Sequence, residues 1–531
     1  MTGRLPPEPP TWLSDIIAAV PGLDAHPQFI SDIHALHQRF PDAATTDLLT
    51  RFAKCLLRTA EPMRAMNHLL RYLDASAAPD ALWHQWQQHP EHVTYALTVF
   101  AESSFLSAML CRHPDWLLWL LEDAIHKPSP APEALAAELQ HQLQHDVRQA
   151  GAEVADTLRA FTHRHLMRIG AQDLNDLVDI ETAAAALSTL ADTVVQAGVD
   201  HCQRELEAEH GKPMFVDETG EQRPCGFCVI GMGKLGGYEL NFSSDIDLMY
   251  VYDSYEGQTS GAVRNDQWRA PISNHEYFVK FSQRLTNLIG GNGPEGQAFR
   301  VDLRLRPDGT QGQLALALLA YEAYYTRFGQ TWEQMALLKA RPIAGDARLG
   351  AAFMALVQPF VYQRHLDREG LTRIQNMKRE IDAQIADKAQ SHTNVKLGLG
   401  GIREIEFFIQ IHQLIYGGRY PELQDRQSLS TLSKLQAAGF LSPEVETLLR
   451  ERYIYLRRLE HRLQMEQGSQ THTLPRQDSS RQRLARQYGF DTWDAFYQDY
   501  LDQTQTVHDV FTRVFDHNLE PPWNPSETPA T

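Results

Sequence analysis

The chain has 531 residues, of which 43% are apolar and 22% charged, and its formal net charge is −18. A single hydrophobic core stops growing at about 250–300 residues, so we expect roughly two to four domains. The acidic balance disfavours general nucleic-acid binding, because displacing counterions from phosphates requires an excess of Lys and Arg.

The N-terminal region has apolar residues at helical spacing, for example Leu187, Leu190 and Val194. We therefore expect residues 1–205 to form a helical domain. The Pro-rich stretch Lys127–Pro132 predicts a break between helices.

Nothing in the sequence indicates secretion or a membrane. The first ten residues are polar and Pro-rich and lack the apolar h-region of a signal peptide. The strongly apolar run Trp116–Leu121 is far shorter than the about 20 residues that cross a bilayer. Five cysteines, few and odd in number, are typical of a reducing compartment. We expect a cytoplasmic protein.

The pattern changes near residue 212, where residues 206–345 indicate a small α/β domain. His210–Pro224 is rich in Gly, Pro and charge and is predicted to be a loop. A helix capped by Ser273 or Asn274 is predicted to end at Gly290-Gly291. Three runs are typical of strands: Phe227–Ile230, Ile246–Tyr252 and Ala298–Leu305.

Helical patterns return after this domain, and we expect residues 346–517 to form a C-terminal helical bundle. Ser442-Pro443 is typical of a helix start, with Ser as N-cap and Pro at the first helical position. Residues 518–531 are polar and Pro-rich, which favours a disordered tail. The fold class predicted is α+β and predominantly helical, with a small sheet domain between helical domains.

A glycine-rich segment follows the first predicted strand. Gly231, Gly233 and Gly236 match the dinucleotide pattern G-x-G-x-x-G, but that match alone is weak. A Walker P-loop requires another order of residues and is disfavoured. Glycines let backbone N–H groups approach a phosphate, and Lys234 adds a point charge.

Asp245 and Asp247 flank Ile246 at the start of the second strand. Residues i and i+2 of a strand point to the same face, so the two carboxylates should lie side by side. Adjacent like charges are costly unless a cation neutralises them, and hard oxygen ligands suit Mg²⁺. The sequence therefore predicts a metal site.

Asp302 is the third candidate ligand. On the predicted strand Ala298–Leu305 it would share a face with Arg304 and Arg306, a combination suited to metal and polyphosphate. The alternative for Asp302 alone is a solvated face with ion pairs. Together with the glycines and Asp245-Ile246-Asp247, the metal site is favoured.

These residues carry a resemblance. Gly236-Gly237, then Asp245-Ile246-Asp247, then Asp302 on a later strand resemble the polymerase-β-type nucleotidyltransferase fold. Longer motifs resemble the glutamine synthetase adenylyltransferase/adenylyl-removing family: Arg168–Leu174, Gly231–Leu248, Phe299–Pro307, Asn394–Phe407, Glu460–Gln464 and Gln470–Pro475. The resemblance extends from about residue 20 to residue 517, and it makes 206–345 the nucleotidyltransferase domain.

The resemblance implies a magnesium-dependent enzyme with two metal ions. Members of the family usually contain two nucleotidyltransferase units. One attaches AMP to a tyrosine of glutamine synthetase, and the other removes it by phosphorolysis to give ADP. This sequence contains one unit, and its wording GMGKLGG, NFSSDIDL and GLGGIREIEF is similar to the N-terminal, adenylyl-removing unit. Implied partners are glutamine synthetase, ATP, ADP and phosphate, and a PII-type signalling protein; no nucleic acid or membrane is expected.

The resemblance also assigns the site residues. Asp245, Asp247 and Asp302 are expected to be the catalytic metal ligands. Nucleotide and phosphate contacts are expected from Gly233, Lys234, Gly236, Gly237, Ser243, Ser244, Arg304, Arg306 and Glu404. Lys234, Arg304 and Arg306 have structural ion pairing as an alternative, and Glu404 could instead serve only the helix dipole.

Alternative functions remain open at this stage. ATP-dependent adenylylation of glutamine synthetase would use the same residues. A non-catalytic nucleotide-sensing module is disfavoured because all three acids are present, and the acidic charge disfavours an RNA substrate.

Overall fold

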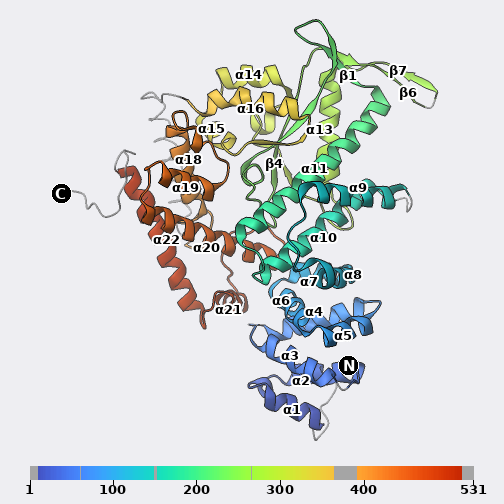
Figure 1. Cartoon of the computed structure of the whole chain (residues 1–531), viewed down its shortest axis with the longest axis vertical. Helices are drawn as coiled ribbons and strands as arrows, with labels where there is room; N and C mark the ends of the chain where they lie inside the picture. The colour runs from blue at the N-terminus through green and yellow to red at the C-terminus, as the bar shows by residue number, and fades with distance from the viewer. Residues whose placement is uncertain are drawn as a thin grey trace, which may run out of the picture.

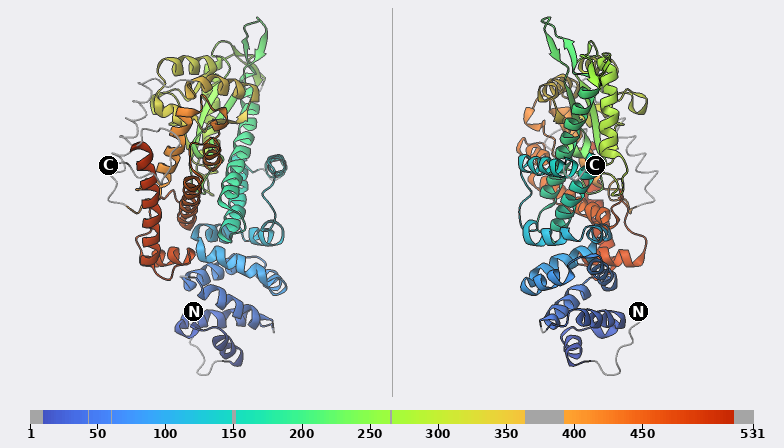
Figure 2. Two further views of the ribbon diagram at one scale, coloured as in Figure 1. Left: turned by 60° about the vertical axis from the view of Figure 1, so that its left-hand side comes forward. Right: turned by 90° about the vertical axis from the view of Figure 1, so that its right-hand side faces the viewer.

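The computed structural model describes residues 10–42, 44–59, 61–148, 152–264, 266–363 and 392–516. The described chain is predominantly helical, with its small sheets at one end and the first helices at the other (Figure 1). The two views of Figure 2 show helices α1 to α6 stacked into an arm that leads away from the sheet. The predicted fold class, predominantly helical α+β, is confirmed.

The N-terminal region is helical, as expected. Several of its helices begin with proline, for example Pro27 and Pro62, whose fixed φ suits the first helical turn. The predicted break Lys127–Pro132 separates η2 from α9. The helices are α1 Thr11–Ala19, η1 Leu23–Ala25, α2 Pro27–Arg39, α3 Thr45–Leu57, α4 Pro62–Ala75, α5 Pro79–Gln88, α6 Pro90–Glu102, α7 Ser104–Arg112, α8 Asp115–Trp119, η2 Leu120–Ala124, α9 Pro132–Arg148, α10 Val154–Leu174 and α11 Ile180–His210.

The central sheet has the order β10-β3-β4-β8, with β9 also pairing with β4. β3 is antiparallel to β4 and β10, whereas β8 and β9 run parallel to β4. Its strands are β3 Phe227–Gly231, β4 Ile246–Tyr252, β8 Val301–Asp302, β9 Ala315–Ala317 and β10 Arg341–Gly345. Smaller sheets contain β1 Pro213–Val216, β2 Gln222–Pro224 and β5 Gln258–Thr259, and the hairpin β6 Ala262–Arg264 with β7 Gln267–Arg269.

Two predictions for this region are wrong. The segment His210–Pro224 is no plain loop, because β1 and β2 form an antiparallel hairpin within it. The strand predicted over Ala298–Leu305 is reduced to β8, Val301–Asp302. Asp302 ends it, because its Oδ1 accepts the Arg304 N–H at 2.8 Å, a local hydrogen bond that turns the chain.

The remaining helices cover the sheet and form the C-terminal bundle. The helix predicted to start with Ser273 or Asn274 as N-cap is confirmed as α13, and Ser273 is its N-cap. The predicted start Ser442-Pro443 is confirmed as that of α20. Residues 518–531 lie outside the described residues. The helices are α12 Gly233–Gly236, α13 Asn274–Gly290, η3 Gly309–Gln311, α14 Leu318–Arg327, α15 Thr331–Leu337, α16 Ala347–Val361, α18 Ile402–Tyr416, η4 Pro421–Leu423, α19 Ser428–Ala437, α20 Pro443–Gln467, α21 Asp478–Gln487 and α22 Trp493–Asp516.

The two faces of the sheet belong to different hydrophobic cores. Val229 and Tyr250 point into a core shared with α11, α13 and the N-terminal helices. Ile230 and Val251, one residue on in each strand, point into the core of α14, α16 and the C-terminal helices. Because alternate strand residues face opposite sides, β3 and β4 connect the two helical regions.

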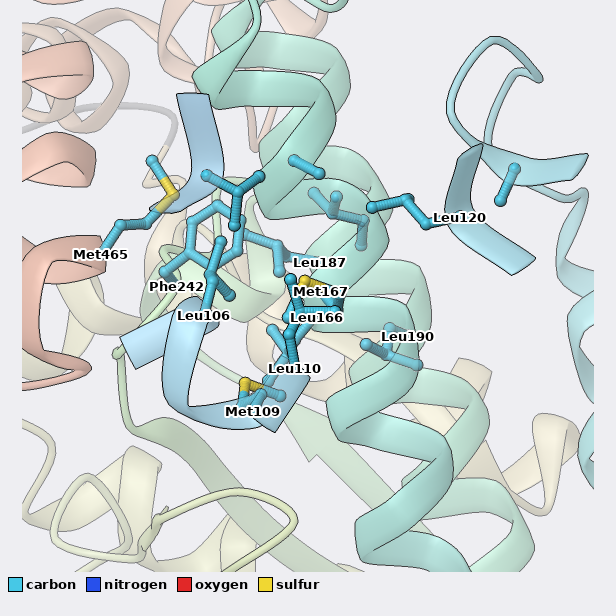
Figure 3. Close-up of a cluster of buried hydrophobic side chains, with 14 of the residues drawn as sticks. Leu106, Met109, Leu110, Leu120, Leu166, Met167, Leu187, Leu190, Phe242 and Met465 are labelled. Atoms are coloured by element: carbon cyan, nitrogen blue, oxygen red, sulfur yellow. The ribbon is translucent and has the colours of Figure 1, made fainter. Parts of the chain in front are cut away.

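Phe242 anchors the loop that leads into β4. It lies among buried side chains of the N-terminal helices and Met465 of α20 (Figure 3). Its ring packs edge-on against His461 of α20 with centroids 5.4 Å apart. Gly170 of α10 provides the space for the Phe242 ring, because a Cβ at position 170 would lie 2.7 Å from the Leu106 side chain and 3.2 Å from the Phe242 ring. Packing from three regions therefore fixes the approach to Asp245.

Among the described residues, no single helix has both the length and the apolar character to cross a membrane. In the part of the chain that the structure describes, one helix pair, α6 and α7, satisfies those two criteria when taken together, with a bend of 115° between them.

Candidate active site

The structure brings the three aspartates together at the start of β4. Asp247 is the second residue of β4 and pairs in register with Asp302 of the parallel strand β8. Asp245 directly precedes the strand, and its negative charge acts on Asp247. We call Asp245, Asp247 and Asp302 the aspartate cluster.

Asp247 is electrostatically strained. Its burial, together with the negative charges of Asp302 and Asp245, raises the pKa of Asp247 to about 7. A nearby cation would relieve this strain, and three carboxylates are the donor set that hard divalent ions such as Mg²⁺ prefer. The residues present therefore fit a divalent cation.

Two arginines partner the other two aspartates. Arg300 Nε donates to Asp245 Oδ1 at 2.6 Å, and Arg304 Nε donates to Asp302 Oδ2 at 2.8 Å. Burial acts to raise the pKa of Asp302, but the hydrogen bonds and charge of Arg304 outweigh it, and the pKa lies below its ordinary value. With these partners in place, the oxygens of the aspartate cluster do not all lie within 4.8 Å of one another. The Arg304 side chain is 72% exposed, so a competing cation can displace it readily.

Arg306 lies elsewhere than the sequence predicted. The expectation that Asp302, Arg304 and Arg306 share one strand face is wrong, because the strand ends at Asp302. Arg306 is buried, and its guanidinium donates to the carbonyls of Leu303 at 2.6 Å and Gly312 at 3.1 Å. These contacts shape the loop after β8.

The glycine-rich turn passes directly beside Asp247. Gly233, the first residue of α12, has a φ of +54°, a conformation that favours glycine. A Cβ at Gly233 would lie 2.7 Å from Asp247 Oδ2. The Met232 N–H also donates to the Asp247 carbonyl at 2.9 Å. The turn and the aspartate cluster are therefore one structural unit.

Gly236 and Gly237 have structural contacts in place of the expected free amides. Their N–H groups donate to the carbonyls of Met232 and Gly233 at 3.0 and 3.1 Å within the turn of α12. A Cβ on Gly236 would lie 2.0 Å from the Lys339 carbonyl oxygen, so only glycine allows this packing. The structure thus accounts for both glycines without a phosphate.

Ser243 and Ser244 lie half-buried in the loop before Asp245. The Ser243 carbonyl accepts a hydrogen bond from Arg300. Within the described part of the chain, neither serine hydroxyl has a hydrogen-bond partner. Both hydroxyls therefore remain candidates for a phosphate contact.

Lys234 is bound in a buried ion pair. Its Nζ donates to both Glu460 oxygens, at 3.0 and 2.9 Å, and burial lowers the pKa of Lys234 to about 8. Burial acts to raise the pKa of Glu460, but Lys234, His472 and Arg457 outweigh it and hold the pKa well below its ordinary value. This pair belongs to a larger buried ionic cluster: Lys234, Lys339 and Arg457 with Glu239, Glu406 and Glu460.

The contacts of Glu404 lie within the C-terminal bundle and not at the aspartate cluster. It is buried in α18, and its Oε2 lies 3.2 Å from His508 Nδ1 of α22. The pair of Glu404 with His508 joins two helices of the C-terminal bundle. It gives no support to the phosphate contact expected of Glu404.

Sequence reasoning missed two residues from the C-terminal part of the chain that act on the aspartate cluster, one by contact and one by charge. Gln470 Nε2 lies 3.5 Å from Asp245 Oδ2. The positive charge of Lys396 acts on both Asp247 and Lys234. Both residues lie in motifs that carried the family resemblance, but no local pattern placed them near a strand more than 140 residues away.

Comparison with known proteins agrees with this geometry. Residues 93–356 match the family model described as glutamate-ammonia ligase adenylyltransferase, and residues 375–515 match the model of the GlnD PII-uridylyltransferase. A protein of Stenotrophomonas maltophilia is 42% identical over 343 residues, covering 65% of this chain and 35% of the relative. The chain belongs to the glutamate-ammonia ligase adenylyltransferase family.

Other relatives in this family match more of the chain. A Thioalkalivibrio sulfidiphilus protein is 37% identical over 78% of this chain and 41% of its own length. A Hahella chejuensis protein is 35% identical over 81% of this chain and 43% of its own length. All three relatives are described as bifunctional glutamine synthetase adenylyltransferase/adenylyl-removing enzymes. The chain therefore spans about two fifths of the length of the curated relatives it matches.

Proposed function

We propose that this chain is a magnesium-dependent nucleotidyltransferase unit that removes AMP from adenylyl-tyrosine on glutamine synthetase. Orthophosphate is the acceptor and ADP the product. The observation that carries the proposal is the aspartate cluster on β4 and β8, packed against the glycine turn of α12.

The reaction exchanges one phosphorus–oxygen bond for another. An oxygen of hydrogen phosphate bonds to the phosphorus of the AMP group, and the bond from that phosphorus to the tyrosine oxygen breaks. The proton of hydrogen phosphate passes to the tyrosine oxygen, so that ADP and an unmodified tyrosine result. The chemistry requires positioning and charge neutralisation more than covalent participation by the protein.

The aspartate cluster would hold the metal. When bound there, Mg²⁺, as two ions, supplies positive charge that neutralises the phosphate oxygens. Support comes from Asp247, whose pKa is raised to about 7 by burial and, after it, by the negative charges of Asp302 and Asp245. Ser243 and Ser244 would donate hydroxyl hydrogen bonds to phosphate, and the exposed Arg304 would exchange Asp302 for a phosphate oxygen.

Lys234 has a positioning role in this proposal. Its pair with Glu460 ties the glycine turn to α20 and thereby sets the distance between Gly233 and Asp247. Because Lys234 is bound on both carboxylate oxygens, it is not proposed as a phosphate ligand.

The proposal that the chain removes AMP, and does not attach it, rests on three sequence motifs. The segments GMGKLGG, NFSSDIDL and GLGGIREIEF are similar to the adenylyl-removing unit of the family. ATP-dependent adenylylation is the second candidate, because the names of the relatives contain both activities. A PII-type protein is the proposed regulator, supported by the match of residues 375–515 to a PII-uridylyltransferase model.

Parallel reactions with the full 531-residue chain test the direction. One receives adenylylated glutamine synthetase with orthophosphate and Mg²⁺, and the other unmodified glutamine synthetase with ATP and Mg²⁺. We expect ADP in the first and no incorporated AMP in the second. Modification by ATP without phosphorolysis would overturn the direction, and neither reaction from a nucleotide-binding chain would favour a sensing module.

A further inference from the structure

Most cations around the aspartate cluster already have partners. Arg300 donates to Asp245, and Arg304 to Asp302. Lys234 is bound by Glu460 in the buried ionic cluster, and Arg306 by backbone carbonyls. Lys234 and Arg306 are therefore held by buried partners, whereas Arg300 and Arg304 are held by the aspartate cluster itself.

Lys396 differs from these four cations. No carboxylate of the described residues forms an ion pair with its ammonium, although the side chain is half-buried. Its charge nevertheless acts on Asp247, on Lys234 and on Glu406. A half-buried ammonium that no carboxylate of the described residues binds is available to an incoming anion.

The backbone around Lys396 is held rigidly. The N–H groups of Lys396 and Leu397 both donate to Asn394 Oδ1, at 3.0 and 2.8 Å. The Lys396 carbonyl accepts from the Arg403 N–H at 3.1 Å at the start of α18. A ligand-binding side chain is most effective when its backbone is fixed in this way, because little order must be created on binding.

The same segment is tied to the glycine turn. Val395 N–H donates to the His472 carbonyl at 2.8 Å, and His472 Nδ1 lies 2.8 Å from Glu460 Oε1. Glu460 in turn binds Lys234, the residue after Gly233. A chain of direct contacts thus connects the turn that bears Lys396 with the turn beside Asp247.

We infer that Lys396 is a phosphate-binding residue that the C-terminal bundle contributes to the nucleotide site. The group it binds is the orthophosphate that attacks the AMP phosphorus, which becomes the β-phosphate of ADP. The inference rests on the proposed function for this assignment. The class of ligand recognised is a nucleoside diphosphate. AMP lacks the β-phosphate that Lys396 binds.

Calorimetry with the full chain and Mg²⁺ tests this without requiring turnover. We expect Lys396→Ala to weaken ADP binding by about tenfold or more and to change AMP binding less than about twofold, because the loss of one charge-assisted contact affects only the β-phosphate. Lys396→Arg should retain ADP binding within about threefold. Lys280→Ala, which removes an equal charge from the exposed side of α13, is the matched control.

Several results would overturn the inference. Equal weakening of ADP and AMP would indicate a general or structural effect, and unchanged ADP binding would exclude a contact. Absence of ADP binding by the wild-type chain would also contradict it. Lys396→Met serves as a second variant if Lys396→Ala has a lowered melting temperature.

A kinetic readout separates the two proposals. If the wild-type chain catalyses phosphorolysis, Lys396→Ala should raise the KM for orthophosphate and leave the KM for adenylylated glutamine synthetase unchanged. If the wild-type chain shows no phosphorolysis, the proposed function fails, and the ADP-against-AMP comparison still decides the role of Lys396.

Discussion

Two groups of charged side chains meet at the dipeptide Gly233-Lys234. They differ in whether their acids are matched by an equal number of cations. The aspartate cluster has three acids, of which two have an arginine partner among the described residues. The side chains of these two arginines are at least 41% exposed. The buried ionic cluster has three acids and three cations, and Glu460 is fully buried. An unbalanced, accessible cluster favours binding of an external cation, whereas a balanced, buried one favours architecture.

Removing an acid from the aspartate cluster should affect catalysis and spare folding. We expect Asp247→Asn to lower the rate of adenylyl transfer by about 10³-fold or more, because metal-held charge stabilises the transition state. Its melting temperature should be unchanged or higher, because one of three like charges is gone. Asp502→Asn on the exposed face of α22 is the control, and a variant of Asp247 with wild-type activity would contradict the comparison.

Removing an acid from the buried ionic cluster should instead lower the stability of the fold. Glu460→Ala leaves Lys234 and Arg457 without their carboxylate, and breaking a buried pair costs about 3–5 kcal/mol in the free energy of unfolding. Denaturant unfolding of the variant and the wild-type chain measures this. A loss below about 1 kcal/mol would place Glu460 outside the structural core of the site.

Acid should weaken the same cluster. The pKa of Glu460 is lowered in the folded chain, so its ionisation contributes stability that is present above its unfolded pKa of about 4.3 and is lost as pH falls below it. The difference in unfolding free energy between the wild-type chain and Glu460→Gln should therefore be constant above pH ~5 and shrink below pH ~4. A difference that grows on acidification would contradict this sign.

The smallest effect is expected at Arg304, an exposed partner of the aspartate cluster. Arg304→Ala removes a competitor for Asp302, so Mg²⁺ affinity without nucleotide should rise by up to about fivefold. Stability should be unchanged, because exposed ion pairs contribute little. Calorimetric titration with Mg²⁺ measures the affinity, and a marked fall would show that Arg304 supports the site.

Local patterns predicted those features that depend on neighbouring residues. β4 begins at Ile246 and α13 is capped by Ser273, as their sequences indicate, because strand alternation and capping are short-range effects. The strand over Ala298–Leu305 was predicted too long, because the hydrogen bond from the Arg304 N–H to the Asp302 side chain competes with the ladder.

Long-range partners could not be predicted in this way. Lys234 was expected at a phosphate, but its partner Glu460 is 226 residues away and no periodicity connects them. Lys396 was missed for the same reason, since its electrostatic effect on Asp247 depends on how the C-terminal bundle packs on the glycine turn. Sequence therefore indicated which acids meet, and the fold determined which cations are free to join them.

The most direct test of the central claim is release of ADP from adenylylated glutamine synthetase in orthophosphate and Mg²⁺, with the wild-type chain and with an Asp245→Asn, Asp247→Asn double variant. We expect ADP from the wild-type chain and loss of at least about 10³-fold in the folded double variant. Equal rates from the two proteins would show that the aspartate cluster is not the catalytic site.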